Sequence, residues 1–271
     1  MADPALFLAE GDHFTPTGLC RGGWSDEAQH GGPPTGLLAR AVETIPTVVP
    51  MQVARFTIDL YREVPLTRPL TVATELIRDG RRIQLAEATL SAGSAQVARA
   101  TCLKIRASEV PIPAQVESWS PPPGPDEAHP VDWDAVGLDW GPTTRFHLHA
   151  VEIRTVEGTW HRRGEGVSWV RLTYPVVAGE EPSSFVRTAT LVDLGNGNSQ
   201  ALDGREWLYV NPDITLYLHR PPRGEWLGLR SHASQHATGI GFADTLLFDG
   251  DGPVGRVGQS QVLEPRSVPA E

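Results

Sequence analysis

The sequence repeats itself once, and this internal duplication limits the possible folds more than any other feature. A shift of 157 residues aligns identical residues along both halves: Pro65 with Pro222, Leu70 with Leu227, Ile83 with Ile240, Ala86 with Ala243, Leu90 with Leu247 and Arg99 with Arg256. A shift of 158 aligns the segment 56–58 with 214–216. This period is far longer than that of solenoid repeats, so it predicts two copies of one domain in a single chain.

A proline-rich segment separates the two copies. Prolines recur through it at positions 111, 113, 121–123, 125, 130 and 142. Proline lacks a backbone N–H, so we expect no helix and no central strand there. The predicted organisation is an N-terminal domain over 1–107, a linker over 108–142 and a C-terminal domain over 143–271.

Each copy is predicted to contain one helix and several strands. In the first, apolar residues at helical spacing follow Pro33 and Pro34 over 35–45. In the second, a helix begins at Ser183 or Ser184 and ends at Gly195. β-branched, alternating segments bounded by Gly or Pro follow each helix, and 146–156 is also predicted as a strand. The fold class is therefore α+β, with a helix followed or wrapped by a long antiparallel sheet in each copy.

Composition argues against several functional classes. The 33 acidic and 23 basic residues give a net charge of −10, which disfavours nucleic-acid and anionic-membrane partners. Two cysteines are too few for a disulfide scaffold or a cysteine-based zinc site. The N-terminus has no basic stretch before an apolar run, so we expect a cytoplasmic protein.

Motifs for metal, cofactor or nucleophilic chemistry are missing from the sequence. There is no G-x-S-x-G elbow and no complete G-x-G-x-x-G. His232 and His236 lack the glutamate of H-E-x-x-H, and His147 and His149 are interpreted as ordinary histidines on one strand face. We therefore predict no metal and no cofactor.

The duplication also shows where one copy alone carries polar residues. In the alignment of the two copies, the counterpart of Asp213 is Arg55 or Phe56, that of Ser234 is Ile77 and that of Gln259 is Cys102. A carboxylate can act as general base on water, and a hydroxyl and an amide can orient that water or stabilise an oxyanion. A turn aspartate, a solvent-facing serine and a surface amide are the alternative interpretations.

Two segments of the second copy carry a family resemblance. They are NPDITLYLHRPPRGEWLGLRSHAS and GIGFADTLLFDGDGPVGRVGQSQ, and HGGPPTGLLARA resembles the entry to the first helix. The chain resembles the acyl-CoA thioesterase II-like, or TesB-like, double-hotdog family. In that family an aspartate precedes a strand leading into a His-Arg-Pro turn, here Asp213. A hydroxyl residue on the next strand aligns with Ser234, and a glutamine on the last strand aligns with Gln259.

The resemblance implies two hotdog domains and hydrolysis of acyl-CoA to free acid and CoA, without a covalent intermediate. Asp213, Ser234 and Gln259 would activate the water. His30, Gly31 and Gly32 would bind substrate, with backbone N–H groups stabilising an oxyanion. The resemblance also implies a homodimer and a role in lipid metabolism. Arg220, Arg223 and Arg230 are the candidates to meet the CoA pyrophosphate, and solvated surface arginines are the favoured alternative interpretation.

Two alternatives remain open at this stage. One is a hotdog enoyl-CoA hydratase or dehydratase, which needs an aspartate and a histidine, and Gly11-Asp12-His13 resembles only part of such a motif. The other is an inactive acyl-CoA-binding protein, because a fold does not guarantee chemistry. The eight tryptophans fit either a pocket for a bulky acyl group or ordinary core packing. The sequence does not indicate the acyl length or whether the carrier is CoA or an acyl carrier protein.

Overall fold

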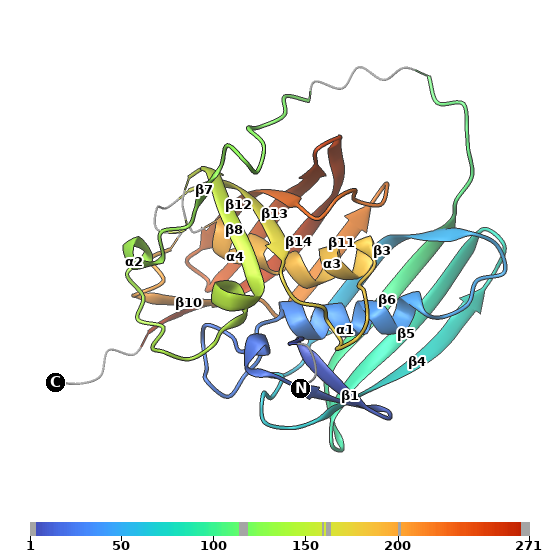
Figure 1. The fold of residues 1–271 in the computed structure, drawn as a ribbon, viewed down its shortest axis with the longest axis horizontal. Helices are drawn as coiled ribbons and strands as arrows, with labels where there is room; N and C mark the ends of the chain where they lie inside the picture. The colour runs from blue at the N-terminus through green and yellow to red at the C-terminus, as the bar shows by residue number, and fades with distance from the viewer. Residues whose placement is uncertain (1–3, 114–118, 159, 161–163, 200–201, 267–271) are drawn as a thin grey trace.

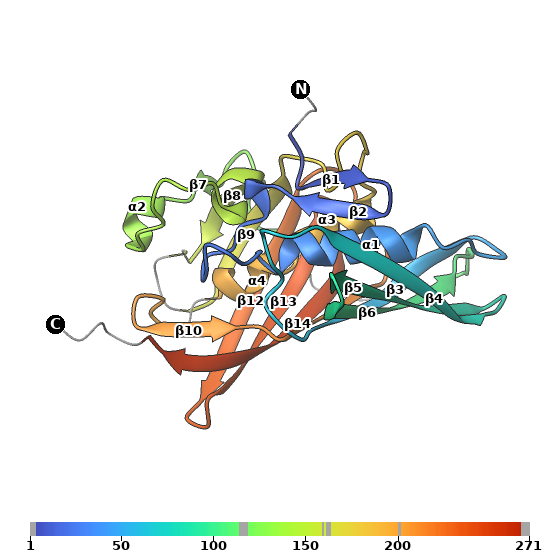
Figure 2. The ribbon, with the colours of Figure 1, turned by 90° about the horizontal axis from the view of Figure 1, so that it is seen from below.

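The computed structural model describes residues 4–113, 119–158, 160, 164–199 and 202–266 (Figure 1). One antiparallel sheet runs through both halves of the chain and curves around two central helices (Figures 1 and 2). This arrangement is the predicted α+β double hotdog, with one long helix in each half.

The sheet places all N-half strands on one side and all C-half strands on the other. In spatial order, the N-half strands are β1 (Phe7–Glu10), β2 (His13–Pro16), β4 (Leu70–Asp79), β5 (Ile83–Ala92), β6 (Ala95–Arg106) and β3 (Met51–Leu60). The C-half continues with β11 (Asp213–Leu218), β14 (Gly252–Pro265), β13 (Ile240–Asp249), β12 (Leu227–His236), β9 (Gly166–Leu172), β8 (Val151–Glu157) and β7 (His129–Pro130). A further strand, β10 (Trp207–Val210), pairs with β14.

The two halves join through β3 and β11, the strands that the 158-residue shift aligns. They pair antiparallel with Thr57 opposite Thr215, and Ile58 opposite Ile214. Residues 57 and 215 are themselves related by the shift, so the pairing is symmetric about them. The duplicated strands therefore meet across a pseudo-twofold axis, as in a dimer with identical patches on both partners.

Helices α1 (Gly32–Glu43) and α3 (Ser184–Leu191) lie side by side beneath this junction (Figure 2). Ser183 caps α3 by accepting the N–H of Val186. A side chain at Gly32 would overlap the carbonyl of Thr190, and one at Gly36 would overlap the Thr190 hydroxyl. The two glycines thus allow the helices to approach closely.

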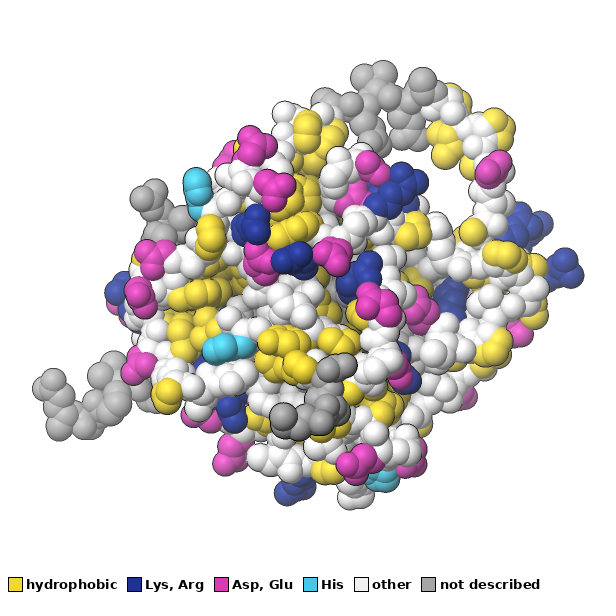
Figure 3. Space-filling model, viewed as in Figure 1, with side chains coloured by type: hydrophobic (Ala, Val, Ile, Leu, Met, Phe, Trp, Pro, Cys, Tyr) yellow, Lys and Arg dark blue, Asp and Glu magenta, His cyan; other side chains and the backbone are white. Residues whose placement is uncertain are grey.

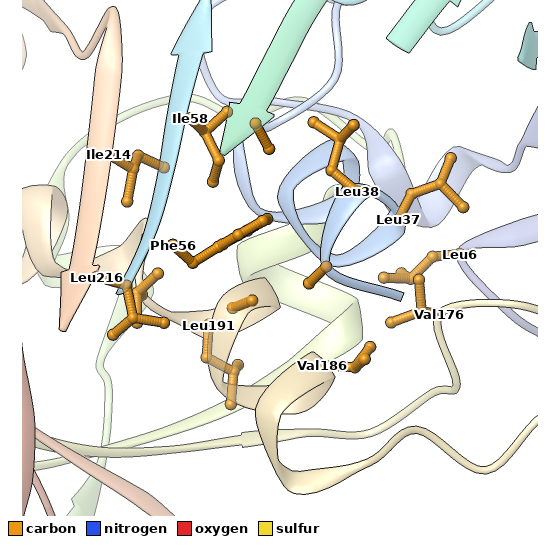
Figure 4. Close-up of a cluster of buried hydrophobic side chains, with 14 of the residues drawn as sticks. Leu6, Leu37, Leu38, Phe56, Ile58, Val176, Val186, Leu191, Ile214 and Leu216 are labelled. Carbon is orange, nitrogen blue, oxygen red and sulfur yellow. The ribbon is translucent and has the colours of Figure 1, made fainter. Parts of the chain in front are cut away.

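The core fills the space between the sheet and these helices. Leu37, Leu38 and Val42, predicted as the apolar face of the first helix, are fully buried. Phe56 lies between the strands and the helices and contacts Phe185 edge-on, with ring centroids 5.4 Å apart (Figure 4). Both hotdog halves therefore share one hydrophobic core.

Three local expectations are wrong. A short helix, α2 (Trp133–Val136), forms within the proline-rich segment, in its proline-free part and capped by Asp132. Residues Phe146–Ala150 form a π-helical turn, so His147 and His149 do not share a strand face. Gly195 does not end the second helical region but lies inside α4 (Leu194–Asn198). Glycine is needed at this position for packing, because a Cβ there would come 2.5 Å from Thr245 Oγ1.

No helix in the described ranges is both long enough and apolar enough to cross a membrane. A short 3₁₀ turn, Gly18–Cys20, leads from β2 toward α1 and brings the loop before α1 against the second half. The domain boundaries predicted at residues 107 and 142 stay predictions.

We expect Gly36→Ala to destabilise the protein by about 1–3 kcal/mol, because the new methyl group overpacks the contact with Thr190. Thermal or urea unfolding measures this change. Gly250→Ala is the control, since a Cβ there meets nothing within 4 Å. Equal stability of both variants would show that the α1–α3 contact is looser than described.

Candidate active site

Asp193 is the buried carboxylate around which the site is organised. It follows the last turn of α3 and precedes α4, and its side chain is 5% exposed. At the end of α3 a carboxylate faces the negative end of that helix dipole, although Asp193 is also the N-cap of the short helix α4. It is held there by hydrogen-bond donors from both halves of the chain.

His30, directly before α1, supplies the contact from the first half. Its Nδ1 lies 2.7 Å from Asp193 Oδ2, and the ring packs against Phe146 with centroids 4.8 Å apart. A Cβ on Gly31 would come 2.8 Å from the same carboxylate oxygen. Glycine at position 31 therefore lets the N-terminal end of α1 approach the carboxylate.

The surroundings keep Asp193 ionised. Burial alone would raise the pKa of its carboxyl, but the charge of His30 and hydrogen bonds from His30, Asn211 and the Gly32 N–H outweigh it. The net pKa of Asp193 is lowered from its ordinary value. A buried carboxylate with several donors stays charged and fixes the groups around it.

A chain of amides leads to Asp193, each donating to the next. Gln261 Nε2 donates to Asn196 Oδ1, Asn196 Nδ2 donates to Asn211 Oδ1 over 3.2 Å, and Asn211 Nδ2 donates to Asp193 Oδ1 over 2.6 Å. Gln235 Nε2 donates to Gln261 Oε1 over 2.9 Å and begins the chain. Hydrogen bonds aligned in one direction strengthen one another, so the chain stabilises the ionised carboxylate.

A cavity of about 330 Å³ opens beside His30, Gly31 and Asp193. Its walls are mostly apolar and aromatic, and they include Trp24, Trp133, Trp140, Trp160 and Tyr209. On the face shown in Figure 3, hydrophobic side chains gather in the region of α2 and β10, the two elements that supply Trp133 and Tyr209. An apolar cavity with a few convergent polar groups is typical of a small-molecule site.

Arg145 links the loop before α1 to the proline-rich segment at the edge of this cavity. Its guanidinium donates to the carbonyls of Gly22 and Trp140 and pairs with Asp26 over 2.6 Å. The Arg145 side chain is 9% exposed, so the pair is largely shielded on the arginine side. The segment predicted as a linker therefore forms one wall of the cavity.

Four of the predicted site residues come together here. His30, Gly31 and Gly32 meet Asp193, as described above. Gln259 is fully buried, and its Nε2 lies 3.2 Å from Asp193 Oδ1. Gln259 supports the carboxylate from the sheet and does not line the cavity.

The structure does not bring Asp213 and Ser234 to this site. Ser234, Phe242 and Ser260 lie opposite one another on three neighbouring strands and form one row across the sheet. Gln259 lies opposite Ala243, in the adjacent row. Because strand side chains alternate between faces, the row of Ser234 points away from the core. Asp213 accepts the Ser260 N–H over 3.0 Å, in the same outward row. Among the residues that the structure describes, no contact supports catalysis by either residue.

The arginines expected to meet CoA have other partners. Arg220 forms a bidentate pair with Asp249, with both N–O distances 2.6 Å. Arg223 pairs with Asp251, and Arg230 lies 5.7 Å from the ring centroid of Trp119. Of the described arginines, Arg62 lines the cavity.

Sequence reasoning missed Asp193 and Asn211. A signal for Asp193 was present, because it is the one acidic residue in the second helical segment and stands at the end where the dipole disfavours it. Such local conflicts concentrate at functional sites. Asn211 carries no comparable signal, since an asparagine before a proline is an ordinary turn residue.

Comparisons with solved structures agree with the fold. A hotdog-fold protein from Alicyclobacillus acidocaldarius is 14% identical with a TM-score of 0.71, covering 97% of this chain and 96% of its own. The acyl-CoA thioesterase II TesB2 of Mycobacterium marinum is 16% identical with a TM-score of 0.66, covering 95% of both chains. An inactive mutant of the CurJ dehydratase is 16% identical with a TM-score of 0.51, covering 86% of this chain and 82% of its own. No curated protein sequence matches the chain.

Family models identify both halves of the sequence. The acyl-CoA thioesterase N-terminal domain matches residues 20–105, and the acyl-CoA thioesterase C-terminal domain matches residues 115–263. The second match alone spans more than half of the chain. The protein therefore belongs to the acyl-CoA thioesterase family, with the N-terminal and C-terminal domains of that family joined in one polypeptide.

Proposed function

We propose that this thioesterase hydrolyses acyl-CoA to free acid and CoA with a water molecule activated by His30 and Asp193. The 2.7 Å contact between these side chains, beside the apolar cavity, is the observation that carries the proposal. Asp193 accepts bonds from Asn211, Gln259 and His30, and its pKa is lowered, so it is a weak proton acceptor. His30 is the more accessible partner, with 17% of its side chain exposed.

Gly32 N lies 3.1 Å from His30 Nδ1 and also beside the Asp193 carboxylate. In this scheme its N–H donates to Asp193, so Nδ1 of His30 carries the proton that Asp193 accepts and Nε2 is the basic nitrogen. Nε2 takes a proton from water while the water oxygen bonds to the thioester carbon. The C–S bond then breaks, and the same proton passes to the departing CoA sulfur. No covalent enzyme intermediate is needed.

The negative oxygen of the tetrahedral intermediate would lie at the N-terminal end of α1. Pro33 and Pro34 have no N–H, and the Gly32 N–H is directed at the His30–Asp193 pair. The Gly31 N–H has no acceptor among the described residues and is the donor we assign to this oxyanion. Gln259, Asn211 and Asn196 act as positioning residues through Asp193.

A second candidate activity is hydration of an enoyl-CoA. The pairing of His30 with Asp193 supplies the histidine and aspartate that this chemistry requires, which the motif at residues 11–13 alone did not. The family models favour hydrolysis. Assaying crotonyl-CoA for loss of its enoyl absorbance beside the release of free thiol separates the two activities.

Asp193→Asn should lower kcat by about two to four orders of magnitude, because the amide no longer fixes the His30 tautomer or stabilises its cation. Asp213→Asn should retain most of the activity. Release of free thiol from acyl-CoAs measures both variants, with circular dichroism as the check on folding. The opposite pattern would return the base to Asp213.

His30→Gln should lower kcat by about as much as Asp193→Asn, and the double variant should lower it little further. The effects of residues that act as one unit are not additive. A double-mutant cycle on kcat measures this coupling. If the two losses multiply, His30 and Asp193 act independently and the proton transfer assigned to His30 is wrong.

We also propose a homodimer through the outer face of the C-half sheet. Ile240, Phe242, Val262 and Tyr217 are 64%, 50%, 45% and 54% exposed on this face. Ile240 pairs directly with Val262, and Phe242 lies two residues along the same face of β13, so these three side chains form one patch on adjacent strands. Tyr217 lies farther along the sheet, opposite Arg256. Contiguous exposed apolar patches mark interaction sites.

Phe242→Glu combined with Ile240→Glu should convert the dimer to a monomer, because it places charges in a desolvated interface. Val262, which also lines the cavity, is left unchanged. Sedimentation velocity measures the mass. Ile112→Glu, at an exposed residue of the proline-rich segment, is the control. A wild-type monomer would contradict the proposal.

The cytoplasmic location and the role in lipid metabolism rest on the sequence and the family resemblance.

A further inference from the structure

Four of the eight tryptophans in the sequence line the cavity next to Asp193. Trp24 comes from the loop before α1, Trp133 and Trp140 from the proline-rich segment, and Trp160 follows β8. Residues from segments far apart in the chain thus converge on one wall. Trp160 is buried in the core and Trp133 packs against it, so these two rings join the hydrophobic core to the cavity.

Two glycines hold tryptophan rings in fixed positions. A Cβ on Gly23 would come 2.9 Å from the Trp140 ring and 3.3 Å from the His147 ring. A Cβ on Gly197, in α4, would overlap the Trp160 ring. Both rings therefore lie directly on backbone, which leaves them little freedom to move when a ligand binds.

The remaining contacts make this wall a rigid aromatic cluster. Trp133 contacts Trp160 with ring centroids 5.7 Å apart and planes 60° apart, and contacts His147 at 5.5 Å and 61°. His147 is buried among these groups, and burial lowers its pKa well below the ordinary value, so its ring is neutral. Aromatic rings prefer such edge-to-face contacts with one another.

Arginines already occupy the faces of two other rings. The Arg145 guanidinium carbon lies 5.9 Å from the Trp140 centroid, and that of Arg266 lies 5.4 Å from the Trp24 centroid. A cage for a cationic ligand needs these faces free. The cavity is therefore not suited to a cationic group.

The size of the cavity limits the group further. At about 330 Å³ it is roughly twice the ~150 Å³ apolar cavity that takes up one benzene ring. One or two rings and the attached thioester carbonyl would fill it.

We infer that the cavity selects compact aromatic acyl groups over linear alkyl groups of the same carbon number. This inference rests on the proposed function, which places the acyl group in the cavity. A flat ring packs against fixed indole edges without losing internal freedom, whereas a linear chain must give up its rotamers to fit.

Phenylacetyl-CoA and octanoyl-CoA form the matched substrate pair, because each acyl group has eight carbons. We expect kcat/KM for phenylacetyl-CoA to exceed that for octanoyl-CoA by about tenfold, since one or two edge-to-face contacts have this magnitude. Equal values, or a preference for the octanoyl group, would overturn the inference.

Trp133→Leu and Trp160→Leu should reduce this preference to about threefold or less, because each removes one aromatic contact. Trp119→Leu is the matched control: it removes a tryptophan that packs on Phe248, with centroids 5.3 Å apart, outside the cavity. An unchanged preference in both cavity variants would assign the selectivity to another surface.

A binding measurement separates this inference from the proposed function. Phenacyl-CoA and 2-oxooctyl-CoA are thioethers without an acyl–sulfur bond, so thioester hydrolysis cannot consume them, and calorimetry gives their Kd values. Tighter binding of phenacyl-CoA without hydrolysis of any thioester would refute the activity and retain the selectivity. Hydrolysis with equal Kd values and equal kcat/KM would refute the selectivity alone.

Discussion

The antiparallel pairing of β3 with β11 is the constraint on which the rest of the molecule depends. It joins the two hotdog halves at Thr57 and Thr215, which are related by the duplication itself. The symmetric pairing fixes the position of each central helix relative to the other, so that the N-terminal end of α1 meets the C-terminal end of α3. The centre that we propose, made from His30 of one half and Asp193 of the other, is complete only in this arrangement. Gly32 and Gly36 maintain it by letting α1 contact Thr190 without overlap.

The pseudo-twofold axis generates a second helix junction, and its chemistry differs. There the C-terminal end of α1 meets the N-terminal end of α3, and Ser183 donates to Glu43 over 2.8 Å. Lys104, the counterpart of Gln261, donates to the carbonyls of Glu43 and Ile45 and so caps α1, and burial lowers its pKa. The groups at this junction satisfy the helix ends, whereas the junction at Asp193 contains an imidazole beside an ionised carboxylate and an aromatic cavity. One copy of the duplicated junction thus stabilises the fold, and the other carries the chemistry that we propose.

The sequence predicted the elements better than their tertiary relations. Helical spacing over 35–45 and the cap at Ser183 are local signals, and a helix is present at each, although the second does not end at Gly195. The face of a strand residue is not a local signal, because a change of one residue reverses it. The duplication and the family resemblance group Asp213 and Ser234 with Gln259, although their rows lie on opposite faces of the sheet. Trp133 and Trp140 lie in a segment whose prolines suggested only a linker, and nothing near them in sequence indicates a cavity wall.

A crystal structure with phenacyl-CoA bound tests the central claim most directly, since the ligand has the carbonyl and the ring but cannot be hydrolysed. The account predicts its carbonyl oxygen within about 3 Å of the Gly31 nitrogen. It also predicts His30 Nε2 facing the ligand and the phenyl ring against Trp133 and Trp160. A ligand bound on the outer face of the sheet, beside Asp213 and Ser234, would contradict the account and restore the site expected from the sequence.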